Sequence, residues 1–346
     1  MNQIPVAVLG ATGTVGQKFV TLLHNHPQFR ITELVASPRS AGKPYREACN
    51  WKQPGLIPTE YATLVVKSIE DPLTSRILFS GLDSSVAGDA ESRYAEAGHV
   101  VISNSKNHRM DPDVPLIIPE INSSHFALVS RQKHKGALIT NSNCSTMFLA
   151  MALAPLHAEF GIEAVQVTTL QAISGAGYPG VASMDIMGNV VPYIGDEEDK
   201  LETETAKILG KLTDAGLEFA EFTVSATCTR VPVFDGHTES VSIKFKRTPS
   251  VAEVKQCLTR FRGPAELQDL HSAPAQPIVV LEENDRPQPL RDLWLENGMA
   301  TVVGRVRECP VMDVKMVLLG HNTVRGAAGA AILNAEAFVK LGYLNS

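Results

Sequence analysis

Cys144 stands in a short polar segment, NSNCST at residues 141–146, between one apolar run and a long apolar stretch. Asn, Ser and Thr are preferred at helix N-caps, so the segment predicts that Cys144 lies at the start of a helix. There the helix dipole and the free backbone N–H groups favour a thiolate. The same N–H groups would hold an oxyanion on a carbonyl attached to sulfur. The segment therefore indicates nucleophilic acyl chemistry at Cys144.

A thiolate nucleophile needs a partner that handles protons, and His237 has the most distinctive setting of the histidines. It ends the segment RVPVFDGH at residues 230–237, just before an expected strand. Arg230 and His237 flank a short turn, so both side chains are expected to point into one site. Taken alone, an arginine and a histidine in such a turn are more often structural than catalytic, so the turn marks both only as candidates.

Three further segments combine polar residues with turn or helix signals. QAISGAGYPG at residues 171–180 follows an expected strand, and its glycines indicate close approach of the backbone to a ligand. Glu204 and Lys207 lie three residues apart on one helical face. KNHR at residues 106–109 follows a strand end, where ligands bind in α/β sheets, and its cations suit a phosphate.

A dinucleotide site is predicted at the N-terminal end. GATGTVG at residues 10–16 lies between an apolar strand pattern and a helical one, and such glycines let the backbone approach a pyrophosphate at a helix N-terminus. The second strand ends at ASPRS, residues 36–40, which contains no acid to hold a ribose 2′-hydroxyl. Arg39 with Ser37 and Ser40 suits a 2′-phosphate, so the cofactor is predicted to be NADP.

The elements that must position these residues follow from hydrophobic periodicity. Strands and helices alternate in the first third of the chain, which predicts a doubly wound, Rossmann-like parallel sheet. Later strands alternate in polarity, which predicts a second α+β domain with a mixed, largely antiparallel sheet. We expect an NADP-binding domain at residues 1–140, joined by a C-terminal helix at 323–346, and a catalytic and oligomerisation domain at 141–322. The later strands are expected at residues 164–170, 218–228, 241–245, 278–281, 299–306 and 314–319, with helices at 145–160, 201–211, 251–261 and 325–341.

Composition excludes several classes of protein. Lys and Arg number 31 and Asp and Glu 37, so the net charge of −6 argues against nucleic-acid binding. The five cysteines are dispersed without a CxxC pair, so we expect neither disulfides nor a metal site. We find no secretory signal and no run of about 18 apolar residues, and therefore expect a cytoplasmic protein outside the membrane.

Taken together, these motifs resemble the aspartate-β-semialdehyde dehydrogenase family, in particular its fungal and archaeal branch. The resemblance runs nearly end to end. It is carried by GATGTVGQKF, ASPRSAGK, FSGLD, SNSKNHR, SNCST, QAISGAGYPG, the Glu204–Lys207 pair, RVPVFDGH and HNTVRGAAG. It implies NADPH-dependent conversion of aspartyl 4-phosphate to aspartate 4-semialdehyde and inorganic phosphate through a cysteine thioester. The resemblance further implies that this step serves lysine, threonine and methionine biosynthesis and that the chain forms a homodimer or homotetramer.

The resemblance also implies a role for each matching residue. Cys144 is the nucleophile, His237 the acid/base, and Gln171 helps to orient the substrate. Arg230 pairs with the α-carboxylate, Glu204 receives the ammonium, Arg109 and Lys207 hold the phosphate, and Asn143 also contacts substrate. Cofactor contacts are expected from Gly10, Thr12, Gly13, Thr14, Val15, Gly16, Ser37, Arg39, Ser40, Ser80, Ser174, Gly175 and Asn322, the last at the nicotinamide end.

Three alternatives remain at this stage. Malonyl-CoA reductase would share the cysteine, histidine and NADPH chemistry but would have no use for a group that binds an ammonium. A non-catalytic NADP-binding paralogue would bind cofactor without thioester chemistry. A cysteine hydrolase would leave the glycine-rich motif without a purpose.

Overall fold

The computed structural model describes residues 3–345, which form two compact units. The first unit contains residues 1–117, 124–141 and 327–346, and the second contains 118–123 and 142–326. The sequence analysis did not anticipate that the short segment 118–123 belongs to the second unit. The chain therefore leaves the first unit after residue 141 and returns to it at residue 327.

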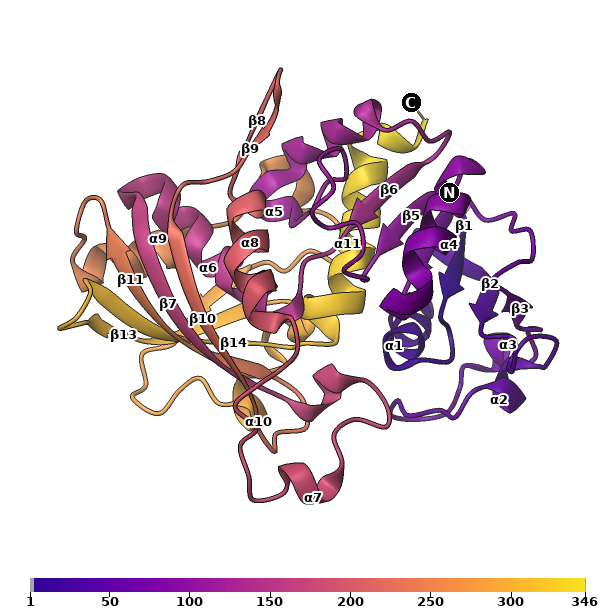
Figure 1. The fold of residues 1–346 in the computed structure, drawn as a ribbon, viewed down its shortest axis with the longest axis horizontal. Helices are drawn as coiled ribbons and strands as arrows, with labels where there is room; N and C mark the ends of the chain where they lie inside the picture. Colours follow the sequence, from indigo (N-terminus) through magenta and orange to yellow (C-terminus); the bar gives the residue numbers. More distant parts are fainter. Residues whose placement is uncertain (1–2, 346) are drawn as a thin grey trace. The chain divides into compact units, whose positions relative to one another are not determined.

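The first unit is built on a six-stranded sheet in the order β3-β2-β1-β4-β5-β6, and every neighbouring pair is parallel. This is the strand order of the dinucleotide-binding fold predicted from the sequence. Figure 1 shows its strands in indigo to purple. The strands are β1 Ile4–Leu9, β2 Phe29–Ala36, β3 Lys67–Ser68, β4 Ile77–Ser80, β5 Val100–Ser103 and β6 Ala137–Thr140.

Helices α1, α4 and α11 pack on this sheet because each presents a face of small and apolar residues to it. The helices of the unit are α1 Thr14–Leu23, α2 Tyr45–Ala48, α3 Thr59–Ala62, α4 Ser84–Glu96 and α11 Gly329–Lys340. A short π-helix, Val324–Ala328, directly precedes α11. The helix that the sequence predicted from residue 325 is therefore not regular α-helix in its first turn. Inside the unit, Nε2 of the buried His26 lies 3.1 Å from the carboxylate of Glu336 on α11.

The second unit contains a six-stranded mixed sheet in the order β10-β7-β11-β14-β13-β12. The two outer pairs are parallel and the three inner pairs are antiparallel, as the alternating polarity predicted. Its strands are β7 Ile162–Gln171, β10 Thr223–Arg230, β11 His237–Phe245, β12 Ile278–Val280, β13 Thr301–Glu308 and β14 Val314–Gly320; β8 Lys211–Thr213 and β9 Gly216–Glu218 form a separate hairpin.

One helix, α6, dominates the core of the second unit. It spans Cys144–Phe160 and contacts four strands of the mixed sheet as well as α8 and α9. Almost every residue of α6 is buried, which explains why its sequence is apolar on all sides. The other helices are α5 Pro119–Asn122, α7 Ser183–Ile186, α8 Glu197–Ile208, α9 Val251–Arg260 and α10 Pro289–Asp292.

Two element predictions were wrong in ways that matter for the site. The strand expected at residues 218–228 is two strands, because the N–H of Ala220 turns away to bond the carbonyl of Ala206 in the last turn of α8. The helix expected at residues 201–211 begins four residues earlier, at Glu197, and ends at Ile208. Three acidic residues in its first turn are favoured there by the helix dipole.

Candidate active site

Asn143 fixes the start of α6 and thereby the position of Cys144. Its side-chain Oδ1 accepts hydrogen bonds from the N–H groups of Ser145 (2.9 Å) and Thr146 (3.2 Å), so Asn143 is the N-cap of the helix whose start the sequence predicted near Cys144. Such a cap stabilises a helix by about 1 kcal/mol. Cys144 is the first helical residue and is partly exposed. Gly326 packs so closely that a Cβ there would lie 2.7 Å from the Cβ of Cys144.

The expected oxyanion donors at this helix end are mostly engaged within the chain. The N–H of Met147 bonds the Asn143 carbonyl, and the N–H groups of Ser145 and Thr146 bond the Asn143 side chain. The N–H of Asn143 donates to Oε2 of Glu204 at 2.6 Å. The prediction that the free amides of this helix end hold an oxyanion is therefore wrong for these four N–H groups, because the cap consumes them.

His237 begins β11 and is completely buried. Its Nδ1 accepts a hydrogen bond from the N–H of Ala172 at 3.0 Å, so the neutral imidazole carries its proton on Nε2. Burial, and to a smaller extent the positive charge of Arg230 and the neighbouring His321, together lower the pKa of His237 to about 3. The imidazole is therefore neutral near pH 7 and presents a donor at Nε2.

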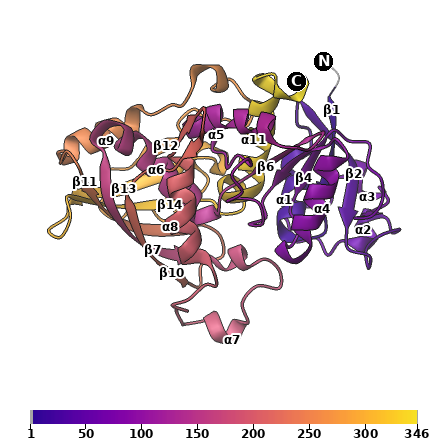
Figure 2. The same cartoon turned by 45° about the horizontal axis from the view of Figure 1, so that its top comes forward.

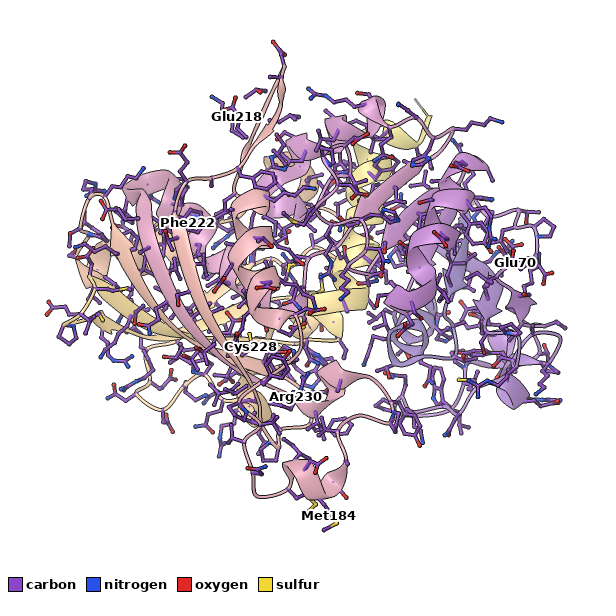
Figure 3. All side chains as sticks on the ribbon, in the orientation of Figure 1. Glu70, Met184, Glu218, Phe222, Cys228 and Arg230 are labelled. Carbon is purple, nitrogen blue, oxygen red and sulfur yellow. The ribbon has the colours of Figure 1, made fainter. Side chains whose placement is uncertain are left out.

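Arg230 ends β10 beside this histidine, as the turn in the sequence predicted. Its Nη1 donates to the carbonyl of Ala172 at 2.8 Å, and the same Ala172 holds His237 through its N–H. Burial lowers the pKa of Arg230, while the charges of Cys144 and Glu197 oppose that effect. Figure 3 shows Arg230 and Cys228 on β10; Cys228 is fully buried and is a core residue.

The glycine-rich segment after β7 lies against both of these side chains. A Cβ on Gly175 would come within 2.9 Å of Arg230 Nη1 and 3.1 Å of His237 Nε2. Ser174, the residue before it, accepts a hydrogen bond from Nδ2 of Asn322 at 2.7 Å, and Oδ1 of Asn322 accepts from the N–H of Gly236 at 2.9 Å. The side chain of Asn322 thus ties two site turns together, and its expected cofactor contact stays a prediction.

Two acidic residues of α8 complete the surroundings of Cys144. Glu204 is buried and accepts from the N–H of Asn143, so this predicted residue does reach the cysteine turn. Glu197, which the sequence analysis missed, accepts from Nδ2 of Asn143 at 2.7 Å and from Nε2 of Gln171 at 3.3 Å. Lys207 is buried on the same helix. The second unit therefore brings together Cys144, His237, Gln171, Arg230, Glu204, Asn143, Ser174, Gly175 and Asn322, whereas the phosphate contact expected of Lys207 stays a prediction.

The remaining predicted residues belong to the first unit. The loop after β1 is tight: Gly10 has φ +73°, and a Cβ on Gly16 would lie 2.1 Å from the Gly10 carbonyl oxygen. Helix α1 begins at Thr14 with Gly13 as N-cap and no side-chain cap, which fits a helix end that receives an anion. Ser37 and Arg39 are exposed in the turn after β2. Thr12, Val15 and Ser40 are partly exposed around the same loops.

Two first-unit predictions need refinement. The side chain of Ser80 is fully buried, and its hydroxyl donates to Glu91 at 2.5 Å, so a cofactor contact from Ser80 could come only from its backbone. Arg109 is also buried and donates to the carbonyl of Asn104 at 2.7 Å. Among residues 3–345, no group of three His, Cys, Asp or Glu side chains is arranged to hold a metal ion. No helix in this part of the chain is long and apolar enough to cross a membrane.

Comparison with known proteins places the chain in a family. Residues 5–129 match the model of the semialdehyde dehydrogenase NAD binding domain, and residues 153–325 match that of the semialdehyde dehydrogenase dimerisation domain. Aspartate-semialdehyde dehydrogenase of Candida albicans is 50% identical, with 97% of this chain and 98% of the relative covered. The chain belongs to the aspartate-semialdehyde dehydrogenase family.

Other members agree with this assignment. The aspartate-semialdehyde dehydrogenase of the archaeon Methanothermobacter thermautotrophicus is 47% identical, covering 96% of this chain and 98% of the relative. A crystal structure of the Candida albicans enzyme with NADP has a TM-score of 0.90 at 47% identity, over 98% of this chain and 99% of that one. A crystal structure of aspartate semialdehyde dehydrogenase II from Vibrio cholerae, complexed with ASA, has a TM-score of 0.80 at 28% identity. The match covers 98% of this chain and 99% of that one.

Gly175 gives a direct test of the site geometry in this member of the family. Gly175→Ala should lower kcat/KM by at least tenfold, because the added methyl displaces the Arg230 and His237 side chains. Stability should change by less than about 1 kcal/mol, since Gly175 is exposed and does not have a positive φ. Steady-state kinetics and thermal unfolding measure the two effects.

Gly195→Ala is the matched control, because a Cβ there meets nothing closer than 3.8 Å. Equal activity of the two variants would show that the 171–180 segment does not approach the reacting groups.

Proposed function

We propose that this chain is an NADPH-dependent enzyme that converts L-aspartyl 4-phosphate to L-aspartate 4-semialdehyde and inorganic phosphate. It carries the activity of its family, aspartate-semialdehyde dehydrogenase, within the synthesis of aspartate-derived amino acids. The observation that carries the proposal is the grouping of Cys144 at a helix start with a buried imidazole, a buried guanidinium and two buried carboxylates.

The first chemical step is carried out by Cys144. Its sulfur attacks the acyl carbon, a C–S bond forms, and the C–O bond to phosphate breaks, so phosphate leaves with the electron pair. The product is a thioester on Cys144. Arg230 pairs with the substrate α-carboxylate, Glu204 receives the ammonium, and Lys207 and Arg109 attract the phosphate. Gln171 and Asn143 help to orient the acyl group.

The second step regenerates the thiolate. When bound, NADPH supplies the hydride that reduces the thioester to the aldehyde. Negative charge develops on the acyl oxygen during this reduction, and Nε2–H of His237 donates to that oxygen. Because Cys144 departs as a thiolate, the hydride step needs no proton from His237. The one proton that the overall reaction consumes goes to the departing phosphate, which takes it from water. In the reductive direction we therefore propose that His237 donates a hydrogen bond to the acyl oxygen, in place of the proton transfer expected from its family role as acid/base.

Cofactor binding is assigned to the first unit, at the loop around Gly10–Gly16 and the turn around Arg39. The tight glycine turn, the uncapped start of α1 and the exposed guanidinium fit a pyrophosphate and a 2′-phosphate. The NADP-bound Candida albicans structure supports NADP as the cofactor. We also propose that the enzyme works in the cytoplasm, where Cys144 stays reduced; fractionation of cells tests this.

An assay of purified enzyme tests the activity. With aspartate semialdehyde, NADP⁺ and phosphate, wild type should form NADPH, and omission of phosphate or replacement by NAD⁺ should lower the rate strongly. The Cys144→Ser variant should have a kcat at least a thousandfold below that of wild type, because a serine hydroxyl is a far weaker nucleophile than a thiolate at pH 7. Cys228→Ser is the control for loss of a buried thiol. Oxidation of NADPH by malonyl-CoA at a comparable rate would instead identify a CoA-thioester reductase.

The pH dependence of kcat tests the state of His237. Because burial lowers its pKa to about 3, the imidazole stays neutral from pH 5 to 9, and no limb near pH 6.5 should come from this residue. The kcat of His237→Ala should still be about a hundredfold or more below that of wild type, which is the usual effect of removing a donor to an oxyanion. A limb near pH 6.5 in wild type that disappears in His237→Gln would contradict the proposed neutral donor.

Self-association through the second unit is a further part of the proposal. The match to a dimerisation domain supports it, as do apolar side chains that the second unit exposes on and around α7. Figures 1 and 2 show α7 in a loop that stands away from the strands of its own unit, and Figure 3 labels Met184 on it. These side chains belong to Tyr178, Met184, Met187, Val190 and Tyr193.

Sedimentation velocity tests this surface. Wild type should sediment as a homodimer or homotetramer, and Met184→Asp combined with Met187→Asp should shift it toward smaller species. Met184 is 94% exposed in the single chain, and burying a carboxylate there would be costly. Leu56→Asp in the first unit is the control, at 92% exposure. An unchanged sedimentation coefficient in the double variant would exclude this loop from the interface.

A further inference from the structure

Glu197 accepts hydrogen bonds from two amide side chains: that of Asn143, which directly precedes Cys144, and that of Gln171, which ends β7. Its Oε2 lies 2.7 Å from Nδ2 of Asn143 and 3.3 Å from Nε2 of Gln171. Its other oxygen, Oε1, lies 2.7 Å from Nζ of Lys200, one turn further along α8. Neither the motif analysis nor the family resemblance assigned a role to this residue.

The direction of these hydrogen bonds is fixed by chemistry. An ionised carboxylate has only acceptors, so the NH₂ group of each amide must face Glu197. The Oδ1 of Asn143 is thereby turned toward the N–H groups of Ser145 and Thr146, as the cap requires. The Oε1 of Gln171 is turned away from the carboxylate. The carboxylate therefore selects the flip state of Gln171 and reinforces the flip state that the cap already requires of Asn143.

Glu197 is ionised in this setting. Burial raises its pKa, but the Lys200 charge and the donated hydrogen bonds outweigh burial, so the pKa is lowered overall. The same negative charge opposes the burial that lowers the pKa of Arg230. The side chain is 11% exposed, so its interactions are only weakly screened by water.

We propose that Glu197 is a positioning residue for the reaction, which acts through Asn143 and Gln171 and does not touch the substrate. It sets the amide of Gln171 so that Oε1 is the atom offered to the substrate, and it holds Asn143 in its capping orientation beneath Cys144. This inference rests on the proposed function and deepens it. The inference gives different roles to two buried acids of α8 that lie seven residues apart. Glu204 bonds the backbone N–H of Asn143, whereas Glu197 orients the side chains of Asn143 and Gln171.

The isosteric variant Glu197→Gln tests the proposal. A glutamine at 197 can accept with one atom only and introduces its own donor, so it no longer specifies the orientation of two amides. The expected result is a 10- to 100-fold lower kcat in the phosphate-dependent assay, the usual size of such outer-layer effects. The fluorescence-measured Kd for NADPH should stay within twofold. Glu198→Gln is the matched control, because Glu198 is in the same helical turn and accepts the Cys228 N–H at 3.0 Å.

Alkylation of Cys144 by iodoacetamide, followed against pH, separates positioning of the amides from an effect on thiol ionisation. Loss of the nearby negative charge should leave the pH midpoint of alkylation unchanged or lower it, although kcat falls. A midpoint that rises in step with the loss of kcat would show that Glu197 acts on thiol ionisation instead, and would overturn the proposal. A kcat within twofold of wild type, or an equal loss in Glu198→Gln, would overturn it as well.

Two checks keep the outcomes separate. Glu197→Asp preserves the charge but is one methylene shorter, so it should retain the fold and have a kcat between those of wild type and Glu197→Gln; full wild-type kcat in this variant would contradict the need for a bridging carboxylate. Absence of phosphate-dependent activity in wild type itself would refute the proposed function, whereas an active wild type with an unaffected Glu197→Gln would refute only the inference.

Discussion

The site depends on how the first turn of α6 is closed. A helix leaves its first N–H groups without partners inside the helix. Here the Asn143 side chain accepts from two of them, and Glu204 accepts from the N–H of Asn143 itself. That closure fixes the backbone on which Cys144 stands. It also engages the N–H groups of Asn143, Ser145 and Thr146 within the chain, which is why the proposed function assigns the hydrogen bond to the acyl oxygen to His237 on β11.

The second constraint is burial of charge. Glu197, Glu204, Lys207 and Arg230 are all nearly inaccessible, and unpaired charges in such positions are costly. Glu204 and Arg230 bond backbone groups of the site segments, and Glu197 bonds Lys200 and the amides of Asn143 and Gln171. The contacts that stabilise these buried charges therefore also orient the site. His237 escapes the same cost by staying neutral, and the Ala172 N–H decides which of its nitrogens keeps the proton.

Sequence reasoning predicted the architecture well where periodicity is strong. The strand-turn-helix pattern around residues 4–23, the parallel sheet and the mixed sheet are all confirmed. It failed at the start of α8, where a run of acids was not included in the helix. The signal was present: residues 197, 201, 204 and 208 are all buried on one face at spacings of four, three and four. Extending the helix backward along that face would have found Glu197.

By itself, the sequence determined which segments become strands and helices, which residues have the chemistry for acyl transfer, and the family to which they belong. These follow from local patterns and from residue types. Only the tertiary structure decided that Asn143, Gln171 and Glu197 meet, that Ser80 is turned inward to Glu91, and that His237 keeps its proton on Nε2. Hydrogen bonds act over about 3 Å, and segments far apart in the chain reach that distance only through packing of the whole unit.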